Sequence, residues 1–87
     1  SLLHMTIYTQ TRKFNNFYKM FFSAKDMLIY RRQDRTSSAY VTIIQTSTKC
    51  YRVIYGDCIN FYGDYNKSKY KSFRTQWELA LWLDELV

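Results

Sequence analysis

The sequence predicts a small α+β domain: a mostly antiparallel sheet of five or six strands with one C-terminal helix packed on one face. Two observations lead to this prediction. Through most of the chain, apolar and polar side chains alternate, as they do in strands with one buried face. After Thr75 the apolar spacing changes to three and four residues, which is typical of a helix. With 87 residues, the chain is long enough for one domain with a small core.

The predicted strands are separated by turns rich in Asn, Asp, Ser and the chain's two glycines. The strands are expected at residues 5–10, 17–22, 27–33, 40–46, 50–55 and 58–62, with 70–73 as a short last strand. Residues 12–16 read as a basic turn, and 34–38 and 63–68 as polar loops. Residues 1–4 resemble a translated cloning site, so we expect Met5 to be the natural start and the single domain to span residues 5–87.

The closing helix is expected over residues 76–87. Thr75 and Glu78 form a capping box, in which the Thr hydroxyl accepts from the Glu78 amide. Glu78 suits the helix dipole in the first turn, whereas Asp84 and Glu85 in the last turn oppose it. An apolar stripe consists of Leu79, Trp82, Leu83 and Leu86, and it is expected to pack on Ile54, Ile59 and Phe61.

Trp77 and Leu81 fall away from this stripe at 100° per residue. One interpretation is that the first strands or the 34–38 loop cover them. The other is an exposed patch that contacts a protein partner or a second copy in a homodimer.

The charge of the chain is divided between its two parts. All 13 Lys and Arg residues and four aspartates lie at or before Arg74, so this part of the chain has a charge of 13 − 4 = +9. The three acidic residues after Arg74 reduce the net charge of the chain to +6. All nine tyrosines lie in the basic part, often beside Lys or Arg. Cations interleaved with flat rings suit a polyanion with stacking bases, which predicts nucleic acid as the partner, with RNA or single strands favoured over duplex DNA.

The turn at Gly56 and Asp57 predicts which tyrosines face outward. A two-residue hairpin there would place Tyr55 opposite Cys58 and Tyr51 opposite Tyr62. The face with Ile54, Ile59 and Phe61 is the more apolar one and is assigned to the helix. The outward face then carries Tyr51, Tyr55, Asn60 and Tyr62 as a stacking surface. Alternatively, tyrosine is simply a good strand residue.

Lysines flank this surface. At period two, Lys67, Lys69 and Lys71 share one side of the last strand, where they would contact phosphates, and Arg74 lies on the other. The alternative is an edge strand that its lysines protect against aggregation. A second basic cluster consists of Arg31, Arg32 and Arg35.

The sequence contains no recognisable set of catalytic residues, so we do not expect an enzyme. The one histidine, His4, precedes Met5, so neither a His-based triad nor a metal site is expected, and no glycine loop for a phosphate-bearing cofactor occurs. Cys50 and Cys58 lack zinc-site spacing and would point to opposite faces, which predicts two reduced thiols in a cytoplasmic protein. No apolar stretch is long enough to span a membrane.

The pattern Phe73-x-Thr75-x-x-Glu78-x-x-x-Trp82-Leu83 resembles the end of the AP2-like arm-type DNA-binding domain of phage and transposon integrases. The resemblance covers residues 50–87. It implies a three-stranded sheet that enters the DNA major groove with a helix packed behind. That family usually has Ala where this chain has Leu79, and it lacks the strand-rich stretch before residue 50.

The sequence is compatible with two functions. The first is a small basic nucleic-acid-binding protein. The alternative is an interaction module, such as a phage-type or mobile-element inhibitor of a host enzyme or defence system, that uses the aromatic surface or the patch of Trp77 and Leu81.

Overall fold

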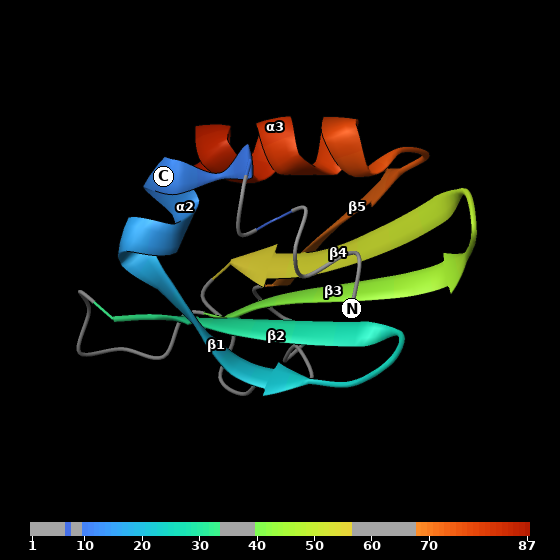
Figure 1. Cartoon of the computed structure of the whole chain (residues 1–87). Coiled ribbons are helices and arrows are strands. Elements are labelled where there is room, and N and C mark those ends of the chain that lie inside the picture. The colour runs from blue at the N-terminus through green and yellow to red at the C-terminus, as the bar shows by residue number, and fades with distance from the viewer. Residues whose placement is uncertain (1–6, 8–9, 34–39, 57–67) are drawn as a thin grey trace.

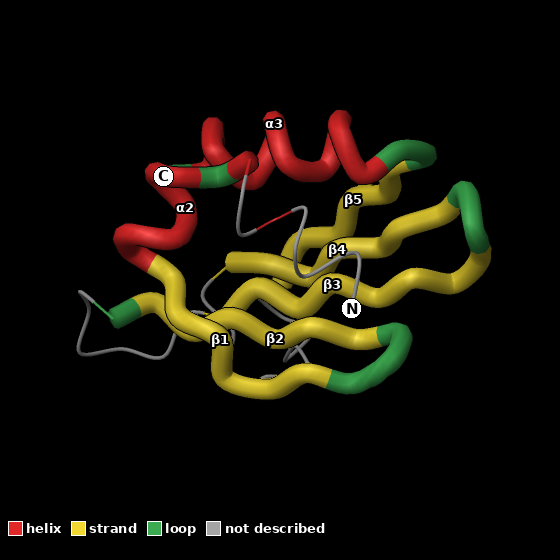
Figure 2. Tube along the Cα trace, viewed as in Figure 1, coloured by secondary structure: helices red, strands yellow, loops and turns green. Residues whose placement is uncertain are grey.

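The computed structural model describes residues 7, 10–33, 40–56 and 68–87, which form a sheet with helices on one of its faces (Figures 1 and 2). The predicted α+β class and the C-terminal helix are confirmed, and a second, short helix accompanies them. The elements are α2 (Arg12–Phe17), β1 (Tyr18–Ser23), β2 (Met27–Arg32), β3 (Tyr40–Ser47), β4 (Cys50–Gly56), β5 (Ser68–Phe73) and α3 (Gln76–Leu86).

The five strands form one antiparallel sheet in the order β1-β2-β3-β4-β5. Each strand therefore pairs with its neighbour in the chain, and β1 and β5 are the edges. A register shift between Met20 and Phe22 makes a bulge in β1. A bulge adds a residue to one strand and changes the side on which the following side chains lie.

The predicted hairpin at Gly56 and Asp57 is wrong. Gly56 ends β4 with a φ of 111°, a left-handed value that glycine adopts without strain. One edge of β4 pairs with β3 and the other with β5, so that Tyr55 lies opposite Lys69 and Tyr51 opposite Phe73. Because a strand has only two edges, β4 has no edge left for a strand at 58–62, a range that lies outside the described residues.

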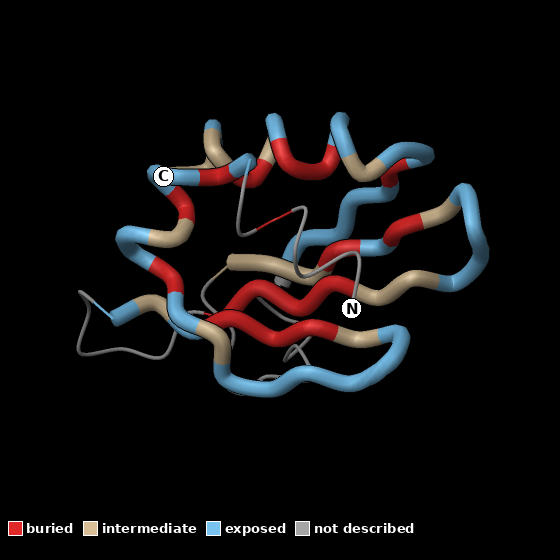
Figure 3. The backbone as a smooth tube through the Cα atoms, in the orientation of Figure 1, coloured by how far each residue is buried: buried red, intermediate tan, exposed pale blue. Residues whose placement is uncertain are grey.

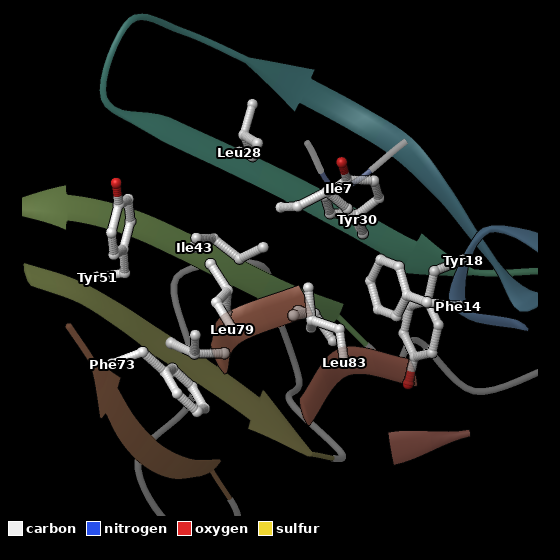
Figure 4. Close-up of a cluster of buried hydrophobic side chains, with 12 residues drawn as sticks. Ile7, Phe14, Tyr18, Leu28, Tyr30, Ile43, Tyr51, Phe73, Leu79 and Leu83 are labelled. Atoms are coloured by element: carbon white, nitrogen blue, oxygen red, sulfur yellow. The ribbon is translucent and has the colours of Figure 1, made fainter. Parts of the chain in front are cut away.

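The core lies between the sheet and the helices (Figure 4). From α3, Leu79 and Leu83 are fully buried, and Phe14 of α2 packs with them. The sheet contributes Tyr18, Leu28, Tyr30, Val41, Ile43, Tyr51, Val53 and Phe73. Trp82 and Leu86, the other members of the predicted stripe, are half-buried against this cluster.

The expectation that Ile54 packs under α3 is wrong, because β4 turns its other face to the helix. Cross-strand partners share a face, and Val53 and Tyr51 are buried in the same core cluster as the α3 leucines. Ile59 and Phe61, which made the Ile54 face look apolar, lie outside the described residues, and the described partners of β4 are β3 and β5. Without them, that face of β4 carries Arg52, so the alternate set of Tyr51, Val53 and Tyr55 is the more apolar and faces the helix.

The predicted basic turn at 12–16 is instead the helix α2. Ile7 and Gln10, from the expected first strand, are also helical, and the other residues of 5–10 lie outside the described part. Oδ1 of Asp84 accepts hydrogen bonds from the backbone N–H groups of Lys13 (3.0 Å) and Phe14 (3.2 Å). An α3 carboxylate therefore caps the start of α2. The sequence around Asp84 indicates only its unfavourable position in the last turn of α3, not its contact with α2.

The predicted start of α3 is confirmed. Thr75 is the N-cap, and its Oγ1 accepts a hydrogen bond from the backbone N–H of Glu78 at 3.1 Å. The cap and the buried leucines fix α3 against the helix-facing side of the sheet, leaving the opposite side of the sheet free of these helices (Figure 1).

Candidate nucleic-acid interface

The tyrosine surface expected from the sequence does not exist as predicted. Tyr51 is only 4% exposed and belongs to the core, so its assignment to an outward face is wrong (Figure 4). Tyr55, on the same side, is half-buried, and its ring meets the Trp82 ring edge-on with 4.6 Å between centroids. Asn60 and Tyr62 lie outside the described residues.

The predicted lysine row is partly described, and its period of two is correct. Lys69 and Lys71 are exposed on edge strand β5, on the same side as Phe73 and therefore on the helix side. The Nζ of Lys71 lies 5.7 Å from the Trp82 ring centre and 5.8 Å from that of Phe73. Lys71 thus covers the half-buried Trp82 ring beside the buried Phe73 ring. Its place on an edge strand also suits protection against pairing with strands of other molecules.

The expected arginine cluster is split between the two faces. The Arg32 guanidinium lies over the Phe17 and Tyr18 rings, at 5.4 and 5.8 Å, on the helix side. Arg31 is exposed on the opposite face. Arg74 is exposed just before α3, whereas Arg35 and Lys67 lie outside the described ranges.

The face of the sheet turned away from the helices, hereafter the outer face, brings together other residues. The register places Lys19, Arg31 and Tyr40 in one row across the strands, and Phe22, Ile29, Thr42, Ile54 and Tyr70 in the next. A third row runs through Met27, Ile44, Arg52 and Ser72. The outer face therefore collects basic and aromatic side chains from both edges of the sheet.

Three large rings on the outer face are exposed: Phe21 by 49%, Phe22 by 46% and Tyr70 by 56%. Phe21 meets the Tyr40 ring edge-on at 5.6 Å, which places it on the same face as Phe22. The middle of the face is closed, since Ile29 and Thr42 are each 3% exposed. The exposed rings thus lie toward the β1 and β5 edges, which Figure 3 shows as the most exposed strands.

The electrostatic character of the outer face is positive. Lys19, Arg31 and Arg52 are exposed there, and none of the described strand residues on this face is acidic. Lys19 and Arg31 are direct cross-strand partners, an arrangement of like charges that weakens a sheet. Lys19 Nζ donates to the Asn15 carbonyl at 2.8 Å, beside the last turn of α2. A bound anion would relieve the repulsion between the two cations.

The sequence interpretation missed Phe21, Phe22, Tyr70, Lys19 and Arg52. The available signal was the run Met20-Phe21-Phe22, whose three consecutive apolar residues interrupt the alternation where the bulge occurs. Tyr70 alternates with Lys69 and Lys71 along β5 and therefore lies on the other side of the strand, which is the outer face.

The described part of the chain shows no grouping of His, Cys, Asp and Glu side chains that could hold a metal ion. Cys50 is a free, half-buried thiol. Burial raises the pKa of Tyr30 well above its ordinary value, as expected for a phenol in the core. Among the residues described, neither helix has the length and apolar character needed to cross a membrane. Comparison with family models, with curated proteins and with solved structures finds no match to this chain.

Proposed function

We propose that the protein binds nucleic acid on the outer face of its sheet, with RNA or single-stranded DNA favoured over duplex. The observation that carries this proposal is the combination of three exposed rings with Lys19, Arg31 and Arg52 on one face, whose described strand residues include no acid. Cations contact phosphates and exposed rings stack on bases, at about 1–3 kcal/mol per base.

The dimensions of the outer face suit an extended strand. Phe22 and Tyr70 occupy one row on opposite edges of the sheet, four strand spacings apart. At about 4.8 Å per spacing, the two exposed rings lie about 19 Å apart on either side of the closed middle of the row, a separation that several nucleotides of an extended strand would span. Arg31 and Arg52 lie in the rows on either side, where they would meet the backbone of the strand.

The charge distribution favours one orientation. Among the described residues before Thr75, eleven are Lys or Arg and only Asp26 is acidic, whereas α3 carries three acids and no cation. A polyanion would therefore approach the sheet with α3 turned away. In the integrase domains that residues 50–87 resemble, the sheet likewise contacts DNA with the helix behind it. The site of action we propose is the cytoplasm, where nucleic acid and a free thiol such as Cys50 coexist.

The proposal is tested by fluorescence anisotropy with short RNA, single-stranded DNA and duplex probes over a range of salt concentrations. The variant Arg31→Ala/Arg52→Ala should weaken binding to all probes. Its slope of log K against log salt should be shallower by about 1.4, because each lost phosphate contact of a single strand contributes about 0.7. Tyr70→Ala should weaken single-strand binding more than duplex binding, since it removes a stacking platform.

The matched control is Lys69→Ala/Lys71→Ala, which removes the same charge from the helix side. Comparable losses in the two double variants would show that only net charge matters and would contradict an outer-face site. A larger loss in the lysine variant would return the site to the β5 row predicted from the sequence. Melting curves establish that each variant is folded.

The interaction-module function is the second candidate, favoured by one observation. Trp77 is 59% and Leu81 49% exposed on α3, as expected for a protein-binding patch. If the wild-type protein binds no probe even at low salt, this function takes the place of the first.

A further inference from the structure

The solvent-facing side of α3 combines exposed apolar side chains with acidic ones. Trp77, Leu81 and Glu85 follow one another at four-residue spacing and are exposed, with Glu78 beside them. We call these four residues the helix patch. The helix patch is apolar at its centre and acidic at its margin, and nothing basic occurs on α3.

Pairing of two helix patches about a two-fold axis is electrostatically unfavourable. An isologous contact places each side chain near its own copy or near the other end of the same patch. It would bring Glu78 and Glu85 of both copies together, with no cation on either α3 to compensate. Like-charge contacts of this kind suppress association, so the helix patch suits a partner surface that is apolar and basic.

The outer face of the sheet has these properties. It presents Phe21, Phe22 and Tyr70 as exposed rings and Arg31 and Arg52 as exposed cations, without a described acid. We infer that the helix patch of one molecule docks on the outer face of a second copy. Trp77 and Leu81 contact the rings of Phe21 and Phe22 at the β1 edge, and Glu78 and Glu85 pair with the arginines.

This contact cannot close into a two-fold dimer. The helix patch and the outer face lie on opposite sides of the two-layer molecule, so a bound pair still has one unused helix patch and one unused outer face (Figure 1). Such a heterologous contact produces open, head-to-tail chains whose length increases with concentration. The inference shares the outer face with the proposed function but does not require nucleic acid to bind there.

Two variants used separately and together test the contact in sedimentation velocity, on protein freed of nucleic acid. Trp77→Ala/Leu81→Ala disables the helix patch, and Arg31→Glu/Arg52→Glu disables the outer face. The wild type should form species of increasing mass with concentration, and fewer of them at high salt. Each variant alone should be monomeric. An equimolar mixture should form a 1:1 heterodimer and nothing larger, because only one intact patch and one intact outer face remain.

Three results would overturn the inference. The wild type could remain monomeric up to about 1 mM, which would exclude any appreciable contact. The outer-face variant could still dimerise, which would show isologous pairing of α3. The mixture could fail to associate although both variants have wild-type melting curves.

A conservative pair of substitutions guards against misfolding as the cause of lost association. Glu78→Gln/Glu85→Gln preserves the size of the side chains and should shorten the chains while reducing their salt dependence. Unchanged association would contradict the charge complementarity. Anisotropy with the Trp77→Ala/Leu81→Ala variant separates the two proposals. If this variant loses self-association but still binds nucleic acid, the helix patch mediates only the contact between copies.

Discussion

Removal of the Asp84 carboxylate should release the start of α2. In the structure, one oxygen of Asp84 accepts hydrogen bonds from the N–H groups of Lys13 and Phe14, the second and third residues of that helix. Loss of an N-cap costs about 0.5–2 kcal/mol, and hydrogen bonds to a charged group contribute about 1.5–3 kcal/mol. Because Asp84 is half-buried rather than fully buried, we expect Asp84→Ala to cost about 2 kcal/mol.

For a domain of this size, such a loss lowers Tm by about 8–16 °C, measured by thermal unfolding of dilute protein. Asp84→Asn keeps an acceptor oxygen, so its cost should be less than half as large. Hydrogen exchange should show faster exchange of the Lys13 and Phe14 amides in Asp84→Ala.

Glu85→Ala is the matched control for Asp84→Ala. It removes a neighbouring carboxylate that is exposed and that opposes the α3 dipole, so it should be neutral or stabilising by about 0.3 kcal/mol. If Asp84→Ala behaves like Glu85→Ala and leaves both amides protected, the cap does not stabilise α2 and the reasoning is refuted.

Three further predictions concern the core and the N-cap of α3. Tyr51→Ala should cost about 3 kcal/mol in urea unfolding, because it empties a buried ring position, whereas a mild loss would show that Tyr51 faces solvent after all. Thr75→Ala should cost about 1 kcal/mol through the lost bond to the Glu78 amide, and Thr75→Ser should restore most of it. Burial raises the pKa of Tyr30, so the stability from its neutral phenol is complete below about pH 10 and falls as the pH rises further. Unfolding at pH 8 and pH 11 should therefore show a smaller alkaline loss in Tyr30→Phe than in wild type, and equal losses would contradict this assignment.

Local sequence patterns predicted most of the elements because their causes are local. The five described strands and α3 lie within one or two residues of their predicted ranges, since alternation and the Thr75 cap are read directly along the chain. The helix α2 was missed because its cap comes from Asp84, about seventy positions away.

The candidate site was harder to predict because it depends on which strands pair. The choice of outward face rested on one assumed turn after Gly56, and with β5 as the actual partner of β4 the assignment of Tyr51 reverses. The bulge in β1 then places Phe21 and Phe22 where strict alternation would have separated them. Strand pairing and bulges are tertiary features, which no single segment encodes.

The sequential strand order has a consequence for how the protein forms during synthesis. Each described hairpin joins neighbours in the chain, so the sheet can assemble strand by strand as it leaves the ribosome. The cover for its apolar side comes last, since α3 supplies both the buried leucines and the carboxylate that fixes α2. Before α3 has been synthesised, Tyr30, Ile43 and Val53 cannot pack in one core with Leu79 and Leu83. An intermediate that has formed the sheet but not α3 therefore exposes apolar strand surface, which favours aggregation.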